Sequence, residues 1–250
     1  MNTVVANHVT VTGRRSLPGR RFDHWFFSGT AVLMLVTVFV GFAPTYYLAG
    51  IFRAPLPSPI IHVHGALFSC WLLLLIMQTS FVSTHRVDLH RRLGLFGFLL
   101  ASAMFVVGIL AATDRLARGA TPPSFDPYFF YIIPLTDMLI FATLIFFAYR
   151  SRLDSPAHKR LIYVATTGLL IAAIARWPLT YVHRNAPRAA LLSYVFLLLL
   201  IAYDYWSTRK IHRATLWASG FLIVVQTIRL PIGNTAAWHS FAAWVQSIAR

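Results

Sequence analysis

The sequence contains very little acidic charge and almost no cysteine. Among its 250 residues there are seven aspartates and no glutamate, two lysines, and a single cysteine, Cys70. One cysteine excludes an internal disulfide and a cysteine-based metal cluster. Only 12% of the residues are charged, against about 25% in soluble domains, and 58% are hydrophobic. This composition excludes a soluble enzyme, a disordered chain and a disulfide scaffold, and it predicts a polytopic membrane protein.

Long apolar stretches occur seven times along the chain. Each has roughly 17–23 residues, enough at about 1.5 Å per residue to cross about 30 Å of hydrocarbon. They lack the alternating polar residues of membrane β-strands, so an all-α protein with seven transmembrane helices is predicted. The stretches are Trp25–Tyr46, Ile60–Val82, Leu93–Ala112, Phe129–Tyr149, Leu161–Pro178, Ala189–Tyr205 and Leu216–Ile232.

Basic residues are distributed unevenly between the two sides that these seven spans define. One side receives Arg14, Arg15, Arg20, Arg21, Arg86, Arg91, Arg92, Arg150, Arg152, Lys159, Arg160, Arg209, Lys210 and Arg213. The other receives Arg53, Arg115, Arg118, Arg184, Arg188 and Arg250. Because cytoplasmic loops are enriched in Lys and Arg, the bias places the N-terminus in the cytoplasm and the C-terminus outside, and a cytoplasmic (inner) membrane is expected. The net charge of +15 then reflects topology and anionic-lipid contacts, and no nucleic-acid partner is expected.

The domain organisation predicted from these patterns is simple. Residues 1–24 form a cytoplasmic tail, residues 25–232 a seven-helix transmembrane domain, and residues 233–250 an amphipathic helix on the outer surface. The tail is not a cleavable signal, because the apolar run after it is longer than a signal core and no small-residue cleavage site ends it. Trp238, Phe241, Val245 and Ile248 recur at helical spacing, which is typical of a helix lying in a membrane interface.

Several ionisable side chains fall inside the predicted spans. Such groups are costly at membrane depth and by default indicate function. Asp137, Arg176 and Arg229 fall in the outer half, whereas Asp204 lies near the inner end and is interpreted as an interface residue. Two arginines and one aspartate make the outer cluster cationic, which favours an anionic ligand. Two other interpretations stay open: the arginines snorkel to the outer headgroups, or the charges only fix helix register.

The candidate binding residues are drawn from this outer layer. His64 lies on one helical stripe with Trp71 and Gln78, at i, i+7 and i+14, and should face other helices. Depth arithmetic along the helices predicts that Asp137 pairs with Arg176, with Arg229 as a second partner. The predicted ligand-binding set is His64, Asp137, Arg176 and Arg229, with Tyr46, Tyr47, Gln78 and Gln226 as hydrogen-bonding neighbours.

Some chemistries are excluded by the residues that are present. Lys159 and Lys210 both lie at the predicted inner interface, so neither supplies a buried retinal Schiff base. The sequence has no histidine box, no paired glutamates for a di-iron centre, no phosphate loop and no nucleophile elbow. His62 and His64 point about 200° apart on a regular helix, so no shared metal ion is expected. No catalytic residue is assigned, and the question of enzyme activity stays open.

Three motifs carry a family resemblance: PTYY at 44–47, HVHGALFSCW at 62–71 and HRRLG at 90–94. They resemble an uncharacterised family of bacterial multi-pass membrane proteins over most of the chain, which implies no activity. The last two motifs are also locally similar to the two-haem transmembrane b-type cytochromes, whose paired histidines open two parallel helices. The corresponding pair here would be His64 and His90. One predicted helix separates these two residues, which places them roughly 30 Å apart across the membrane.

A haem b would therefore need a different pair of ligands. The sequence offers His90 with His158 or His212 at the inner side, or His64 with His183 or His239 at the outer side. The residues by themselves predict no cofactor. Three functions are weighed: an outward-facing pocket that binds or transports a small anion, a haem- or quinone-linked redox protein, and a structural or accessory subunit. The anion pocket is preferred.

Overall fold

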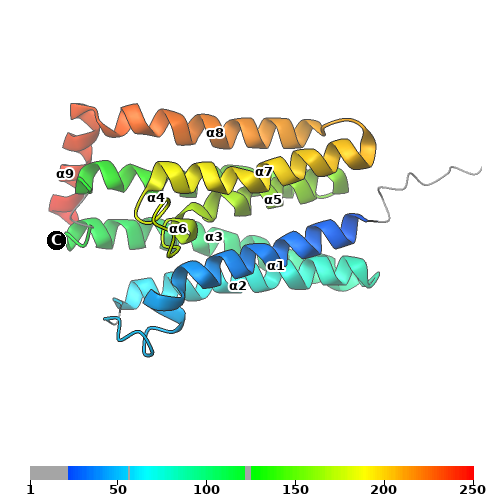
Figure 1. Cartoon of the computed structure of the whole chain (residues 1–250), viewed down its shortest axis with the longest axis horizontal. Coiled ribbons are helices and arrows are strands. Elements are labelled where there is room, and N and C mark those ends of the chain that lie inside the picture. Colours follow the sequence, from blue (N-terminus) through cyan, green and yellow to red (C-terminus); the bar gives the residue numbers. More distant parts are fainter. Residues whose placement is uncertain (1–21, 56, 122–124) are drawn as a thin grey trace, which may run out of the picture.

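Within residues 22–55, 57–121 and 125–250, which the computed structural model describes, the secondary structure consists of helices joined by short connections, without strands (Figure 1). The helices are α1 (Asp23–Phe42), the π-helix η2 (Ala43–Tyr47), α2 (Pro59–Ser83), α3 (Val87–Ala117), α4 (Pro127–Arg150), α5 (Ser155–Leu169), α6 (Ile171–Ile174), α7 (Ala186–Thr208), α8 (Arg213–Gly233) and α9 (Ala236–Ala249). The predicted tail falls outside these residues except at its end, where Asp23 and His24 already belong to α1.

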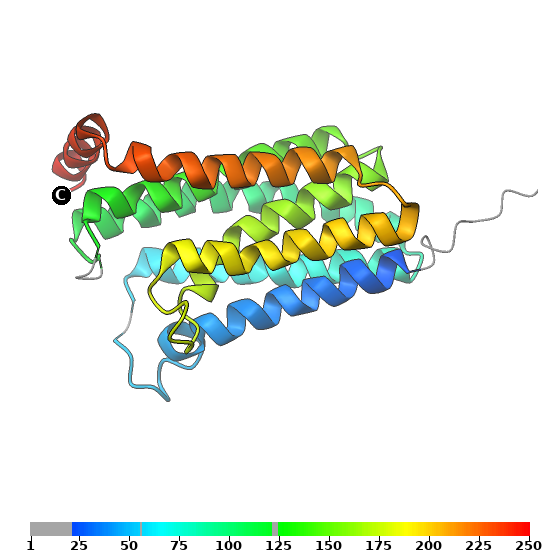
Figure 2. The same ribbon diagram turned by 45° about the horizontal axis from the view of Figure 1, so that its top comes forward.

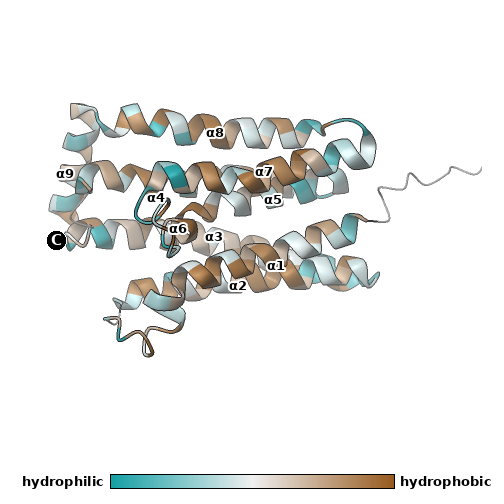
Figure 3. Ribbon diagram, in the orientation of Figure 1, coloured by the Kyte–Doolittle hydropathy of each residue, from teal (hydrophilic) through white to brown (hydrophobic). Residues whose placement is uncertain are grey.

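Seven helical segments are long and apolar enough to cross a membrane, as the sequence predicted. They are Asp23–Tyr47, Pro59–Ser83, Val87–Ala117, Pro127–Arg150, Ser155–Ile174, Ala186–Thr208 and Arg213–Gly233. Hydrophobic residues follow the bodies of the helices, and hydrophilic residues gather toward helix ends and connections (Figure 3). This pattern identifies a multi-pass membrane protein.

Proline and short polar side chains set where several helices begin. Asp126, Asp154 and Asn185 each precede a helix and accept a hydrogen bond from a backbone N–H in its first turn. Each of these helices also has a proline in its first two positions, where the missing N–H costs nothing. The sequence therefore fixes the starts of α4, α5 and α7 more sharply than hydropathy does.

The spanning helices run alternately up and down and form a bundle with two distinct ends (Figures 1 and 2). We call the end where α2, α4 and α7 begin the cavity end, and the end where α1, α3, α5 and α8 begin the far end. Helix α5 is the most buried span and packs against α4, α7 and α8, whereas α2 is largely exposed to the surroundings. The centre of the bundle is therefore built around α5.

Helix α5 is shorter than predicted. It is interrupted at Leu170, whose N–H bonds to the carbonyl of Thr167, and the short α6 ends at Ile174. The predicted span continued to Pro178. Residues 175–185 instead form a connection that folds back, with the Trp177 indole donating to the Thr37 carbonyl at 3.1 Å and Val182 buried. Arg176 thus lies beyond the helix, facing α1.

The far end contains a buried polar network. Arg160 of α5 pairs with Asp204 of α7 at 2.5 Å, and both side chains are almost completely buried. The other oxygen of Asp204 accepts from the Thr215 hydroxyl and the His212 backbone N–H, both of which belong to the start of α8. Asp204, interpreted from the sequence as an inner-interface residue, is therefore buried inside the protein, where it joins three helices.

Helix α9 crosses the cavity end of the bundle (Figures 1 and 2). Val245 is buried against the bundle, and the Gln246 amide donates to the Leu116 carbonyl in the last turn of α3. Phe241, Trp244 and Ile248 point outward and are exposed. The single apolar stripe predicted from Trp238, Phe241, Val245 and Ile248 is therefore divided, because the helix uses part of it to dock on α3 and α4.

Candidate ligand cavity

A cavity of about 560 Å³ opens among α1, η2, α2, α3, α4 and α6 at the cavity end. Its volume lies in the range of small-molecule sites, about 300–1,000 Å³. Five of the eight predicted binding residues line it: Tyr46, Tyr47, His64, Asp137 and Arg176. The rest of the wall is mostly apolar and includes Val38, Phe42, Phe68, Leu72, Ile133, Met138, Leu169 and Ile171.

One wall of the cavity is the π-helix η2, a geometry that occurs frequently at functional sites. The Tyr47 hydroxyl lies 2.7 Å from the Ser69 hydroxyl, and the Tyr46 hydroxyl donates to the His62 carbonyl at 3.1 Å. Gly65 allows this approach, because a Cβ there would lie 2.6 Å from the Tyr46 ring. The two tyrosines thus tie the end of the first span to the start of α2.

The deep end of the cavity is apolar and its polar groups are paired. The Trp71 indole donates to the Thr166 hydroxyl at 3.2 Å, and the Trp71 ring packs edge-on against Phe141. Gly108 of α3 lets the Met138 thioether approach closely, since a Cβ there would lie 2.3 Å from its sulfur. Little at this depth is left to hydrogen-bond a polar ligand.

Arg176 carries a positive charge into the cavity with no carboxylate partner among the described residues. Its guanidinium lies 4.6 Å from the centre of the Phe42 ring and donates to the Ala172 carbonyl at 2.5 Å. Burial, and secondarily the positive charge of Arg115, lower the pKa of Arg176 to about 10. The side chain is therefore charged at neutral pH in surroundings that disfavour the charge.

Two further arginines of the lining, Arg115 and Arg118, were assigned from sequence only to the outer connections. Arg115 lies 4.8 Å from the centre of the Phe130 ring and donates to the Ala120 carbonyl. Arg118 pairs with Asp114 at 2.5 Å and also donates to the Ser58 hydroxyl. The signal that could have found Arg115 is the small-residue stripe Gly108, Ala111 and Ala112, which leaves space on the same helix face.

His64 reaches the same cavity from α2. Its ring stacks on Phe68 with 4.0 Å between ring centres. Its Nδ1 atom is buried without a hydrogen-bond partner. An unpaired buried nitrogen is costly, and it is satisfied if a ligand or water occupies the cavity beside it.

Asp137 pairs with Arg229 of α8 and not with Arg176, which corrects the predicted pairing. The Arg229 guanidinium donates to the Asp137 carboxylate at 2.6 Å and to the Thr136 hydroxyl at 3.3 Å. The reason is structural: α8 packs along α4, whereas Arg176 lies beyond the broken α5. Arg229 is also fully buried, so it does not snorkel, and α8 continues through Pro231 to Gly233.

The remaining two predicted residues lie away from the cavity. Gln226 is buried between α7 and α8, where the Tyr194 hydroxyl donates to its side-chain oxygen at 2.9 Å. Gln78 lies near the far end, where its side-chain amide lies against the His90 ring and the Gly94 N–H. Neither contributes to the cavity: Gln78 lies beyond its deep end on α2, and α8, which carries Gln226, supplies no residue of the lining.

Histidines meet at the far end as well. The rings of His90 and His158 lie 6.4 Å apart at nearly right angles, and His158 Nδ1 lies 2.8 Å from the Ala148 carbonyl. His64 and His90 belong to opposite ends of the bundle, on α2 and α3. Within the described residues, no three His, Cys or Asp side chains gather as a metal site would require.

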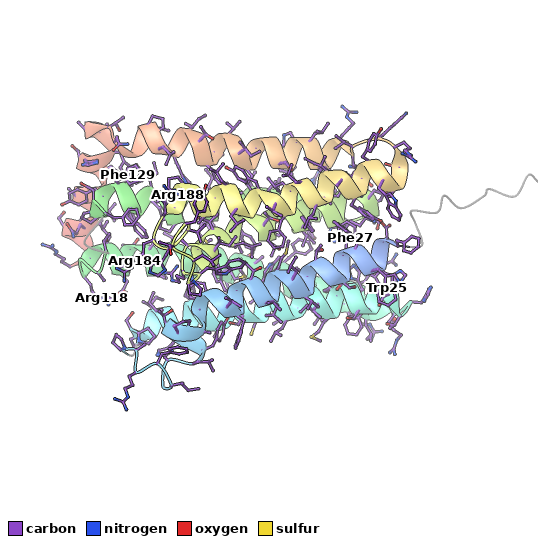
Figure 4. The ribbon with its side chains drawn as sticks, viewed as in Figure 1. Trp25, Phe27, Arg118, Phe129, Arg184 and Arg188 are labelled. Atoms are coloured by element: carbon purple, nitrogen blue, oxygen red, sulfur yellow. The ribbon has the colours of Figure 1, made fainter. Side chains whose placement is uncertain are left out.

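Charged side chains mark the rim of the cavity end. Arg118, Arg184 and Arg188 lie in the half of the molecule that contains α9, and Trp25 and Phe27 lie near the far end (Figure 4). Arg188 lies over the Tyr181 ring, and Arg184 is exposed outside the cavity lining. Of these three arginines, Arg118 alone belongs to the cavity lining, and Arg184 and Arg188 lie outside it.

No protein-family model, curated protein or solved structure matches this chain. The cavity is thus interpreted from its own residues.

Proposed function

We propose that this membrane protein binds a small anionic ligand in the cavity, for uptake, transport or presentation. The observation that carries the proposal is Arg176, a guanidinium directed into a largely apolar cavity without a carboxylate partner among the described residues. An uncompensated charge in such surroundings is costly, and a bound carboxylate or phosphate offsets that cost through charge-assisted hydrogen bonds.

The charges around Arg176 support an anion over a cation. Arg115 adds a second guanidinium without a carboxylate partner, while Asp114 is paired with Arg118 and Asp137 with Arg229. The two acidic groups nearest the cavity are therefore already neutralised. A cationic ligand would meet net repulsion, whereas an anion would enter an attractive field.

The orientation of the protein is also part of this proposal. The far end carries ten of the basic residues counted as inner, and the two N-terminal arginine pairs precede α1, which begins at this end, in the sequence. With the far end in the cytoplasm, the cavity faces the outside of a bacterial inner membrane. Phe241, Trp244 and Ile248 of α9 then face the outer interface, where aromatic side chains are favoured.

Anion binding that depends on Arg176 tests the proposal. The thermal stability of purified protein in nanodiscs of zwitterionic lipid is measured with acetate, benzoate or inorganic phosphate against chloride at constant ionic strength. We expect at least one of these anions to raise the midpoint by several degrees in the wild type and not in Arg176→Gln. Arg184→Gln is the matched control, because it removes a neighbouring exposed arginine outside the cavity.

Equal stabilisation of the wild type and Arg176→Gln by every anion contradicts the proposal. So does the absence of any stabilisation in either protein. Loss of the response in both arginine variants would indicate a general charge effect and not a site.

A second candidate, a redox protein holding a haem b, is favoured by one observation, the His90–His158 pair. Two imidazoles that bind one metal ion at about 2.0–2.1 Å have ring centres roughly 5–6.5 Å apart, and these rings lie 6.4 Å apart. The contact of His158 Nδ1 with Ala148 leaves its Nε2 available, as in many metal-bound histidines. A Soret band lost on His90→Ala and on His158→Ala would support this candidate, and a colourless preparation grown with haem would contradict it.

A further inference from the structure

The cavity is polar at one end and apolar at the other. Arg115, Arg118 and Arg176 all lie toward the cavity end of the bundle, and His64 lies in the second turn of α2. Leu72, Met138 and Leu170 lie toward the deep end. The polar groups of Trp71 and Thr166 are bonded to each other, and the charge of Asp137 is balanced by Arg229. Positive charge free to meet a ligand is thus confined to one end.

The cavity is also elongated along the helices. Its lining runs from Ile61 to Leu72 on α2, about 16 Å at 1.5 Å per residue, and from Gly108 to Arg115 on α3, about 10 Å, with Arg118 just beyond the end of α3. The cavity of about 560 Å³ therefore extends for about three helical turns along α2. Such a space accommodates one extended chain or a flat ring system better than a compact polar molecule.

From these two features we infer that the ligand is a single-chain anionic amphiphile. Its carboxylate or phosphate lies between Arg176 and Arg115, within reach of the unpaired His64 Nδ1. Its apolar chain extends past Phe68 to Trp71 and Leu72. Burial of the ligand chain against this apolar wall is favourable, whereas a small polar anion has no apolar chain to bury there. This inference rests on the proposed anion site and adds the chemical class of the ligand and its orientation in the cavity.

Brominated fatty acids test both the class and the direction. Bromine quenches tryptophan fluorescence at short range. The quenching of Trp71 is obtained by subtracting the fluorescence change of Trp71→Phe from that of the wild type. We expect 10-bromodecanoate to quench Trp71 saturably and 2-bromodecanoate to quench it much less. Arg176→Gln should raise the half-saturating concentration of 10-bromodecanoate at least tenfold, and Arg184→Gln should change it less than twofold.

Competition against 10-bromodecanoate compares chain length and headgroup. Decanoate should compete at a concentration at least tenfold lower than hexanoate, because each buried methylene contributes up to about fourfold. Decanol should compete poorly, and decyl phosphate run beside decanoate identifies the preferred head. Equal quenching by the two bromine positions, or quenching that does not saturate, overturns the inference.

The failure of this inference is distinguishable from the failure of the proposed function. If acetate and decanoate bind equally and both lose binding in Arg176→Gln, the anion site stands and the amphiphile is overturned. If no ligand depends on Arg176, both are overturned.

Discussion

Arg229 and Asp137 form an ion pair in which each residue makes the burial of the other tolerable. Their side chains are only 3% and 12% exposed, and the Nε of Arg229 already lacks a hydrogen-bond partner. Removing one charge leaves the other buried and unpaired, which costs more than removing both. The pair therefore holds α8 against α4 directly behind the cavity wall.

Asp137→Asn should accordingly lower the free energy of unfolding by about 3–5 kcal/mol. Asp137→Asn combined with Arg229→Leu should recover part of that loss, because the double variant leaves no unpaired charge. Denaturant unfolding in mixed micelles measures both. Asp114→Asn, which breaks the more exposed pair with Arg118, should cost less than about 1 kcal/mol. Simple addition of the two substitutions would contradict the coupling.

Arg176 determines how ligand binding should depend on pH. Its pKa is lowered to about 10, so the charged form is disfavoured in the folded protein but still dominates at neutral pH. An anion stabilises that charged form. We therefore expect acetate binding to be constant between about pH 6 and pH 9 and to weaken as the pH rises through 10. Calorimetric titrations check this prediction. A binding constant that already falls steeply as the pH rises from 6 to 8 would indicate that a protonated histidine binds the anion instead.

The depth of a residue along a helix was easier to predict from the sequence than the direction in which its side chain faces. Tyr46, Tyr47, His64, Asp137 and Arg176 all line one cavity, whereas Gln78 and Gln226 do not. Depth follows from counting residues along a helix. The direction in which a side chain points depends on the rotation of its helix about the helix axis. The sequence of a helix that is apolar on all sides says little about this rotation. Arg115 was missed for another reason: its apolar stretch was predicted to end at Ala112, whereas α3 continues to Ala117.

At the scale of elements, the junction between η2 and α2 shapes the cavity wall. Gly65→Ala would place a Cβ 2.6 Å from the Tyr46 ring and so displace it. We expect a loss of about 1–3 kcal/mol in unfolding free energy together with weaker anion binding. The control is Gly29→Ala in α1, where a Cβ meets nothing within 4 Å, and which should leave stability unchanged or slightly raised. Unchanged binding in Gly65→Ala would separate η2 from the site.

The elements themselves were largely predictable. Seven apolar stretches and their flanking proline and aspartate residues locate the spans within a few residues, because hydrocarbon thickness leaves little choice of length. The exceptions have local causes. Helix α3 begins at Val87, six residues before its apolar stretch, and α5 is interrupted at Leu170, which hydropathy does not detect. Because of that interruption, Arg176 lines the cavity without pairing with Asp137, which pairs with Arg229.

At the scale of the whole molecule, the count of basic residues predicts an inside N-terminus and an outside C-terminus. Cys70 can be replaced by serine, since it is exposed on α2 and no partner constrains it among the described residues. In that background, Ser247→Cys in α9 should react with a membrane-impermeant maleimide in intact cells. Arg152→Cys, between α4 and α5, should react only after lysis. The reverse pattern would turn the cavity toward the cytoplasm.

The most direct measurement of the central claim is the side-chain NMR signal of Arg176 during an anion titration. In nanodiscs with ¹⁵N-labelled arginine, the Nε–H resonance of Arg176 is assigned by its loss in Arg176→Gln. The account predicts a saturable shift of this resonance with acetate, accompanied by Arg115 and absent from Arg184. An Arg176 resonance that does not shift, or that shifts in parallel with the resonances of the exposed arginines, would contradict an anion site in the cavity.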